Sequence, residues 1–159
     1  MKVKQVRTKD EIEEVRLLFR EYEAYLDVDL CFQSFEEELA GLPGKYAPPE
    51  GELLIGVDDN KILGCVAVRS LGGTACEMKR LYVRPGARGT GMGRELVRRI
   101  IGSARDLGYA VMRLDTLDKL TEAIGLYRSF GFRDSLPYYE NPLPGVVYLE
   151  LDLKHSLDE

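Results

Sequence analysis

The sequence has no tryptophan, one histidine and three cysteines among its 159 residues. Because the single imidazole, His155, lies in the C-terminal tail, a histidine-based catalytic triad and a multi-histidine metal site are both excluded. The cysteines (Cys31, Cys65 and Cys76) are odd in number and lack CxxC spacing, which argues against a disulfide framework and a zinc knuckle. These shortages favour a reducing, cytoplasmic location and predict no metal.

Long apolar runs are also missing. No stretch approaches the roughly 18–20 residues that span a bilayer, and residues 1–14 lack the apolar segment of a secretory signal. We therefore expect no membrane partner. The length allows one domain, residues 1–159, and the composition, 45% hydrophobic and 31% charged, is that of an ordinary globular protein.

Charge is spread unevenly along the chain, whose net charge is −5. Residues 79–99 hold seven basic side chains and one acidic one, whereas residues 1–60 hold 15 acidic and 7 basic side chains. A short basic segment in an acidic protein favours a confined anion site over a nucleic-acid footprint. We expect no nucleic-acid partner.

Helices are predicted from capping boxes and from helical spacing of apolar residues. Thr8 with Glu11 begins a helix over residues 9–26, and Ser34 with Glu37 repeats the same box before a shorter helix. Two further helices are predicted over residues 92–104 and 120–130.

Strands are predicted where apolar runs are bounded by turn residues. They cover residues 3–6, 53–57, 62–69, 75–83, 111–116 and 146–153, and the turns near residues 58–60 and 72–73 indicate hairpins. Hairpins followed by strand–helix–strand–helix–strand predict a single α/β (α+β) domain around a mixed sheet.

The segment RGTGMG, residues 88–93, follows an apolar strand and precedes a helix. Closely spaced glycines let backbone amides turn toward one point, and a helix start adds unpaired amides and a positive dipole end, which together suit a pyrophosphate. The segment is not a Walker A loop, because Arg94 and Glu95 follow Gly93. Nor does it match GxGxxG, which would need glycine at position 94.

Arg88-x-x-Gly91-x-Gly93 in this setting resembles the acetyl-CoA loop of the GNAT N-acetyltransferase superfamily. The segment EMKRLYV at 77–83 upstream, and Tyr127 with Gly131-Phe132 downstream, extend the resemblance along most of the chain. It is closest to small bacterial-type members. The resemblance implies a mixed, mostly antiparallel sheet with a splayed parallel strand pair, flanked by about four helices.

The resemblance also implies acetyl-CoA as cosubstrate, with no metal. The pyrophosphate would sit on the loop amides, and the pantetheine arm would pair like an extra strand with the edge of the strand that ends at residue 83. A β-bulge in that strand would present an amide to the thioester oxygen. The implied cofactor-binding residues are Leu81, Val83, Arg88, Gly89, Thr90, Gly91, Met92, Gly93 and Arg94.

Two side chains would complete a direct attack on the thioester by a primary amine in a ternary complex. Glu77 matches the glutamate that takes the proton of the amine, commonly through water, and Tyr127 matches the tyrosine that protonates the departing thiolate. Each residue also has a structural interpretation: Glu77 as a solvent-facing strand residue, and Tyr127 as a core residue.

Other residues have weaker claims. Cys76 fits a small buried apolar group better than a nucleophile. Asp115 and Thr116 follow the strand toward the expected meeting point of acceptor and cofactor, yet they equally fit strand-end residues that cap the next helix. A final group could line an acceptor pocket or form an ordinary loop: Tyr138, Tyr139 and Asn141.

The alternative function is a non-catalytic acyl-CoA-binding or sensing module of the same fold. A binder of nucleic acid or nucleotide phosphates is a second alternative, which the net charge and the lack of interleaved aromatics in residues 84–99 disfavour. The acceptor is expected to be a small-molecule amine, and the acidic residues 1–60 favour a cationic or zwitterionic one. Homodimerisation stays open.

Overall fold

The computed structural model describes residues 1–154, so His155 lies outside the described residues. Its centre is a seven-stranded sheet in the order β1-β2-β3-β4-β5-β7-β6. Within residues 1–154, only β4 and β5 pair in parallel, so the predicted mixed, mostly antiparallel sheet is confirmed. The strands are β1 (Lys2–Gln5), β2 (Glu52–Asp58), β3 (Lys61–Gly72), β4 (Ala75–Val83), β5 (Val111–Leu117), β6 (Arg133–Asp134) and β7 (Val146–Asp152).

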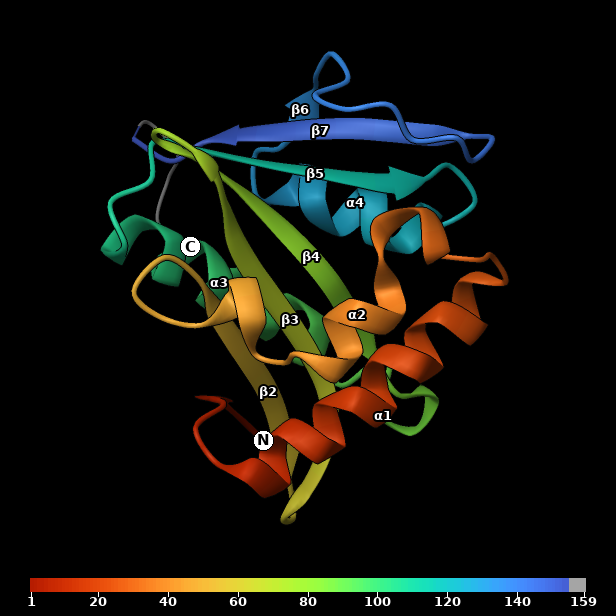
Figure 1. Cartoon of the computed structure of the whole chain (residues 1–159), viewed down its shortest axis with the longest axis vertical. Helices are drawn as coiled ribbons and strands as arrows, with labels where there is room; N and C mark the ends of the chain where they lie inside the picture. The colour runs from red at the N-terminus through yellow and green to blue at the C-terminus, as the bar shows by residue number, and fades with distance from the viewer. Residues whose placement is uncertain (155–159) are drawn as a thin grey trace.

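Helices cover both faces of the sheet (Figure 1). The helices α1 (Lys9–Leu26) and α2 (Phe35–Ala40) lie on the near face, and α3 (Met92–Asp106) and α4 (Thr121–Ser129) lie behind it. The expected four flanking helices are thus present in the described part of the chain. Short 3₁₀ turns connect the elements at Cys31–Gln33, Gly44–Tyr46 and Pro85–Ala87. Between residues 1 and 154, no helix combines the length and the apolar character needed to cross a membrane.

Each face of the sheet has its own hydrophobic core. On the near face, Leu18 and Phe19 of α1 pack in one cluster with Ile55 of β2. On the far face, Leu96 and Ile100 of α3 belong to a second cluster. Strand residues alternate between the two, as the pleat requires, and both faces are buried.

The two predicted capping boxes have opposite outcomes. The first is present: the Glu11 amide donates to Thr8 Oγ1 at 3.1 Å, and the Thr8 amide donates to Glu11 Oε1 at 3.0 Å. The second prediction is wrong. Ser34 has φ +57°, its amide donates to the Cys31 carbonyl, and its side chain makes no cap bond, because this residue closes a 3₁₀ turn instead of extending into the helix.

Strands β4 and β5 start side by side and then diverge (Figure 1). They pair only between Ala75–Glu77 and Val111–Arg113. In the diverging part, the register of β4 against β3 shifts between Lys79 and Tyr82, and Arg80 has φ +63°. This is the expected β-bulge beside the expected splayed pair, and it leaves one edge of β4 unpaired toward β5.

Candidate active site

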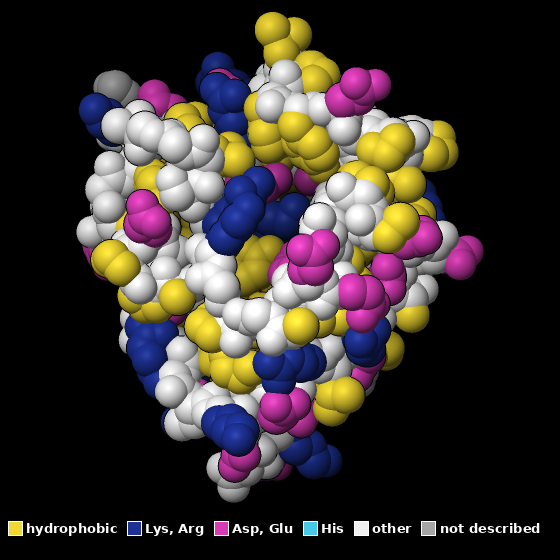
Figure 2. All heavy atoms as spheres, in the orientation of Figure 1, with side chains coloured by type: hydrophobic (Ala, Val, Ile, Leu, Met, Phe, Trp, Pro, Cys, Tyr) yellow, Lys and Arg dark blue, Asp and Glu magenta, His cyan; other side chains and the backbone are white. Residues whose placement is uncertain are grey.

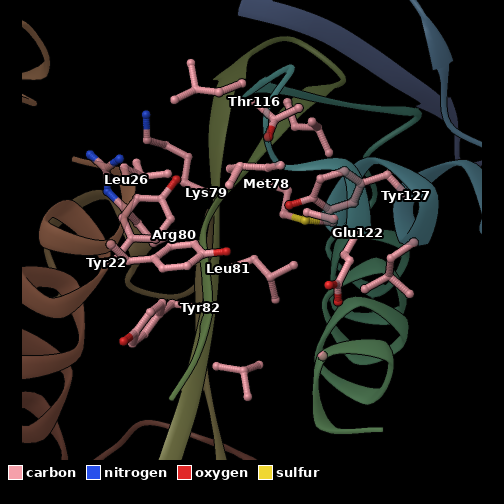
Figure 3. A pocket seen from close by; sticks show the side chains of 18 of the residues that line it. Tyr22, Leu26, Met78, Lys79, Arg80, Leu81, Tyr82, Thr116, Glu122 and Tyr127 are labelled. Atoms are coloured by element: carbon pink, nitrogen blue, oxygen red, sulfur yellow. The ribbon is translucent and has the colours of Figure 1, made fainter. Parts of the chain in front are cut away.

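A cavity of about 620 Å³ occupies the space where β4 and β5 diverge. Its walls come from α1, β4, the glycine loop, the end of β5, α4 and the segment around Asn141. Figure 3 shows that β4 divides it: Lys79 and Arg80 project toward α1, whereas Met78 and Leu81 project toward α4 and Tyr127. The cavity therefore connects the two faces of the sheet.

The glycine loop forms one end of this cavity. Gly89 and Gly91 have φ of +80° and +91°, a backbone region that side-chain-bearing residues rarely adopt, and Gly91 begins α3 without any side-chain cap. Among the described residues, no backbone or side-chain acceptor bonds the amides of Met92, Gly93 and Arg94. A helix start with unpaired amides facing a cavity is an anion site.

The loop residues have different roles in this arrangement. Gly89, Gly91 and Gly93 line the cavity. Thr90 turns its hydroxyl to the Ala87 carbonyl at 2.5 Å, and Met92 is buried. Their side chains therefore shape the loop, and only their backbone is available to a ligand.

The two arginines of the segment line the cavity but rest on aromatic rings. The Arg88 guanidinium lies 4.5 Å from the ring centroid of Tyr25, and its Nε donates to the Val83 carbonyl at 2.9 Å. Arg94 lies 5.3 Å from the ring centroid of Phe130. Their positive charge is thus held at the rim of the anion site.

The β4 edge faces the same cavity. The Arg84 amide donates to the Leu63 carbonyl beside β3, so strand alternation directs the Val83 amide and carbonyl to the opposite edge. At the bulge, the Arg80 carbonyl accepts from the Cys65 thiol on the β3 side. Because N–H and C=O of a trans peptide point in opposite directions, the Leu81 amide is aimed toward the cavity.

Tyr127 reaches the cavity from α4. Its side chain is 7% exposed, its ring packs edge-on against Phe132, and its hydroxyl points into the cavity (Figure 3). Burial raises the pKa of Tyr127 well above the ordinary tyrosine value. The hydroxyl is therefore protonated throughout the working range of pH and can act as a donor.

Glu77 is fully buried on the other face of β4, so its interpretation as a solvent-facing residue is wrong. Its Oε1 accepts from Arg69 Nε at 2.8 Å, and its Oε2 accepts from the Tyr138 hydroxyl at 2.5 Å. Glu77 does not line the cavity, whereas Lys79, whose Nζ lies 3.9 Å from Oε1, does. The fold thus brings Tyr127, but not Glu77, directly to the cavity.

A hydrogen-bonded network of polar side chains borders the near-face half of the cavity, and all of its members except Tyr139 line the cavity itself. Lys79 Nζ donates to Gln33 Oε1 at 3.1 Å, and Gln33 Nε2 donates to the Tyr139 oxygen at 3.1 Å. The Tyr139 hydroxyl and Asn141 Nδ2 both donate to Asp115 Oδ2, the latter at 2.7 Å. On this face Lys and Arg side chains gather at a hollow with acidic side chains beside them (Figure 2).

This hydrogen-bonded network decides between the site and loop interpretations that the sequence left open for several residues. Asp115 does not cap the next helix, since α4 has Leu120 as its N-cap, and both Asp115 and Thr116 line the cavity. Tyr139 and Asn141 belong to the site, and Tyr138 reaches it through Glu77.

Gln33 was not predicted from the sequence, because nothing in its local sequence signals a neighbour more than 100 residues away. Burial raises the pKa of Cys76 to about 12, which leaves no thiolate for nucleophilic attack.

Comparisons with known proteins agree with this geometry. The model of the acetyltransferase (GNAT) family matches residues 12–132. An uncharacterized N-acetyltransferase of Schizosaccharomyces pombe is 47% identical over 150 residues, which cover 93% of this chain and 92% of the relative. An IAA acetyltransferase of Azospirillum brasilense is 36% identical over 110 residues, 67% of this chain and 71% of the relative.

Solved structures show the same fold. The putative acetyltransferase yncA of Salmonella typhimurium, solved with its cofactor acetyl-CoA, superposes with a TM-score of 0.74 at 19% identity, covering 96% of this chain and 94% of that chain. The glycine loop, the splayed strands and the cavity between them are those of an acyltransferase. The chain belongs to the acetyltransferase (GNAT) family.

Proposed function

We propose that this protein transfers an acetyl group from acetyl-CoA to the primary amine of a small molecule, by direct attack in a ternary complex. The observation that carries the proposal is a helix start with unpaired amides that opens into the same cavity as the unpaired edge of β4. A structural neighbour from Salmonella typhimurium was solved with acetyl-CoA, which supports this choice of cosubstrate.

In this proposal the cofactor is bound mostly by backbone. The amides of the glycine loop hold the pyrophosphate, with Arg88 and Arg94 supplying positive charge at the rim. The pantetheine arm pairs with the edge of β4 at Leu81 and Val83. Pairing with Val83 displaces the Arg88 Nε from the Val83 carbonyl, which frees that guanidinium for the phosphates.

The chemistry follows from the bulge and from Tyr127. The amine attacks the thioester carbonyl, and the Leu81 amide stabilises the oxyanion that develops. As the C–S bond breaks, the Tyr127 hydroxyl donates a proton to the thiolate of coenzyme A. Burial raises the pKa of Tyr127, so the hydroxyl carries a proton before the thiolate leaves.

Glu77 is the proposed base. Glu77 does not line the cavity, so the proton of the amine would reach the Glu77 carboxylate through water. Arg69 and Tyr138 hold that carboxylate in place. Removing a proton from the acceptor is required because an alkylammonium has no lone pair with which to attack.

Two measurements test the function. Calorimetric titration with acetyl-CoA should show saturable binding, and a screen of amines that detects free coenzyme A should identify an acceptor. Absence of acetyl-CoA binding would overturn the proposal. Binding without transfer to any amine would instead favour the acyl-CoA-sensing module.

A further inference from the structure

The near-face half of the cavity, where the acceptor would bind and which we call the acceptor half, has two opposite charges on its strands that lack an opposite charge within direct hydrogen-bonding distance. Arg80 is neutralised locally, because its Nη2 lies 2.7 Å from Glu38 Oε1, and the exposed Lys119 donates to the Leu26 carbonyl at 2.7 Å. Glu77, behind the wall, is likewise paired with Arg69 at 2.8 Å. What remains on the facing strands is Lys79 on β4 and Asp115 on β5.

Lys79 is a buried cation with weak compensation. Its side chain is 10% exposed, its one close hydrogen bond among the described residues is to the neutral Gln33, and the nearest carboxylate oxygen, on Glu77, is 3.9 Å away. A buried ammonium is costly unless a counter-ion satisfies it. Burial, followed by the charge of Arg80, lowers the pKa of Lys79, and the opposing charges of Glu77, Asp115 and Glu38 do not reverse the shift.

Asp115 is the complementary case. The donors that it receives, the Tyr139 hydroxyl and the Asn141 amide, are both neutral and both bind Oδ2. Among the described residues no donor bonds its Oδ1, and Asp115 lines the cavity, so these lone pairs are available to a ligand. An ammonium group satisfies such a carboxylate better than any neutral donor does.

The two charges are spaced by neutral groups. Gln33 and Tyr139 join Lys79 to Asp115 through three successive hydrogen bonds, and among the described residues the two charges form no ion pair with each other. The wall thus presents a cation, a neutral stretch and an anion in sequence. A ligand with both signs of charge matches this pattern. Lys79 would repel a polyamine, and Asp115 would repel a polyanion.

We propose that the acceptor is an amino acid or a similar zwitterion, whose carboxylate binds Lys79 and whose ammonium group is oriented by Asp115. The inference rests on the proposed function and narrows its substrate class. Asp115 positions the acceptor nitrogen beside the splayed strands, and Lys79 selects for the carboxylate.

Matched acceptors test this inference in the wild-type protein. The screen should include L-amino acids, their carboxamides and the amines formed by their decarboxylation. A charge-assisted hydrogen bond contributes about 1.5–3 kcal/mol, so kcat/KM for the acid should exceed that for its amide about 10- to 100-fold. Equal use of acid and amide overturns the inference while the proposed function stands.

A variant that removes the charge of Lys79 tests whether this residue binds the carboxylate of the acceptor. Lys79→Met keeps most of the side-chain volume, and it should raise KM for the amino acid about 10- to 100-fold. KM for the decarboxylated amine should rise less than KM for the amino acid, and the affinity for acetyl-CoA should change little. Lys61→Met, at the exposed start of β3, is the matched control and should leave all three quantities unchanged.

The outcomes separate the two proposals. An unchanged KM for the amino acid in a folded Lys79→Met protein overturns the inference alone. Failure of the wild-type protein to acetylate any amine overturns the proposed function and the inference with it. If Lys79→Met does not fold, the comparison of acid with amide decides the question by itself.

Discussion

The two halves of the cavity recognise their ligands by different physical means. The cofactor half offers backbone: the amides at the start of α3, and the edge of β4 at Leu81 and Val83. The acceptor half offers side chains that meet from Gln33, β4, β5 and the segment before β7. Backbone recognition depends on where glycines permit a turn, whereas side-chain recognition depends on which segments the fold brings together.

The difference has a consequence for specificity. Backbone amides suit any phosphate-bearing ligand of the right shape, so the cofactor half can be shared among many acetyltransferases. Charged side chains such as Lys79 and Asp115 can be exchanged one at a time, and each exchange changes the charge that the cavity presents to the acceptor. We infer that substitutions in the acceptor half alter the acceptor, and that substitutions in the cofactor half alter affinity for acetyl-CoA.

Tyr127, on the cofactor side, should give the largest effect. Tyr127→Phe removes one hydroxyl and little volume, so stability and acetyl-CoA affinity should stay nearly constant. Turnover should fall about 10²- to 10³-fold, equivalent to roughly 2.7–4 kcal/mol of transition-state stabilisation.

The pH dependence of this loss carries its own information. Because burial raises the pKa of Tyr127, the hydroxyl is protonated at every pH between 6 and 9.5, and the loss should be constant over that range. Steady-state kinetics would measure it. Wild-type turnover in the variant would return Tyr127 to the role of a core residue.

The glycine loop should give the next largest effect, on binding. Gly91 has φ +91°, so Gly91→Val strains the turn and crowds the amides at the start of α3. Loss of two hydrogen bonds to a charged phosphate predicts an affinity for acetyl-CoA lower by about 100-fold or more.

Gly86→Val is the matched control for this prediction. Gly86 belongs to the same connection, has no positive φ, and has open space where a Cβ would lie. Calorimetric titration of both variants would compare them. Equal affinities in two folded proteins would remove the loop from the cofactor site.

Substitution of Glu77 tests how the amine of the acceptor loses its proton. Glu77→Gln should lower turnover about 100-fold near neutral pH, and the loss should shrink as rising pH supplies unprotonated acceptor. The glutamine can still accept from Tyr138, and Arg69 is partly exposed, so the fold should survive. A loss that stays constant from pH 6 to 9.5 would mean that Glu77 only holds Arg69 and Tyr138 in place.

This contrast between halves also explains what the sequence could predict. The hairpins, the helix over residues 9–26 and the glycine loop could be predicted, because each depends on short-range spacing. The splayed strands, the bulge and the role of Tyr127 came from the family resemblance. The short β6 was not predicted, since two exposed strand residues leave no periodic signal.

The residues of the acceptor half could be predicted from the sequence only in part, for a physical reason. Gln33 and Tyr139 are 106 positions apart, and their contact exists only because α1 and the segment before β7 cover the same face of the sheet. The Ser34 box failed for a similar reason: the turn at Cys31–Gln33 imposes a positive φ that overrides the local capping pattern.

Arg88 should give the smallest effect, because its charge is exposed and lies at the boundary between the halves. Arg88→Ala should weaken acetyl-CoA binding about two- to five-fold, as expected for an exposed ion pair, and the effect should shrink as salt screens the phosphates. Arg88→Lys keeps the charge but loses the flat contact with Tyr25, so it should restore the salt-dependent part. Titrations at low and high ionic strength would separate the two contributions. A salt-independent loss in Arg88→Ala, unrescued by lysine, would show that Arg88 acts by packing on Tyr25 and Tyr82 and shapes the cavity wall rather than attracting the cofactor.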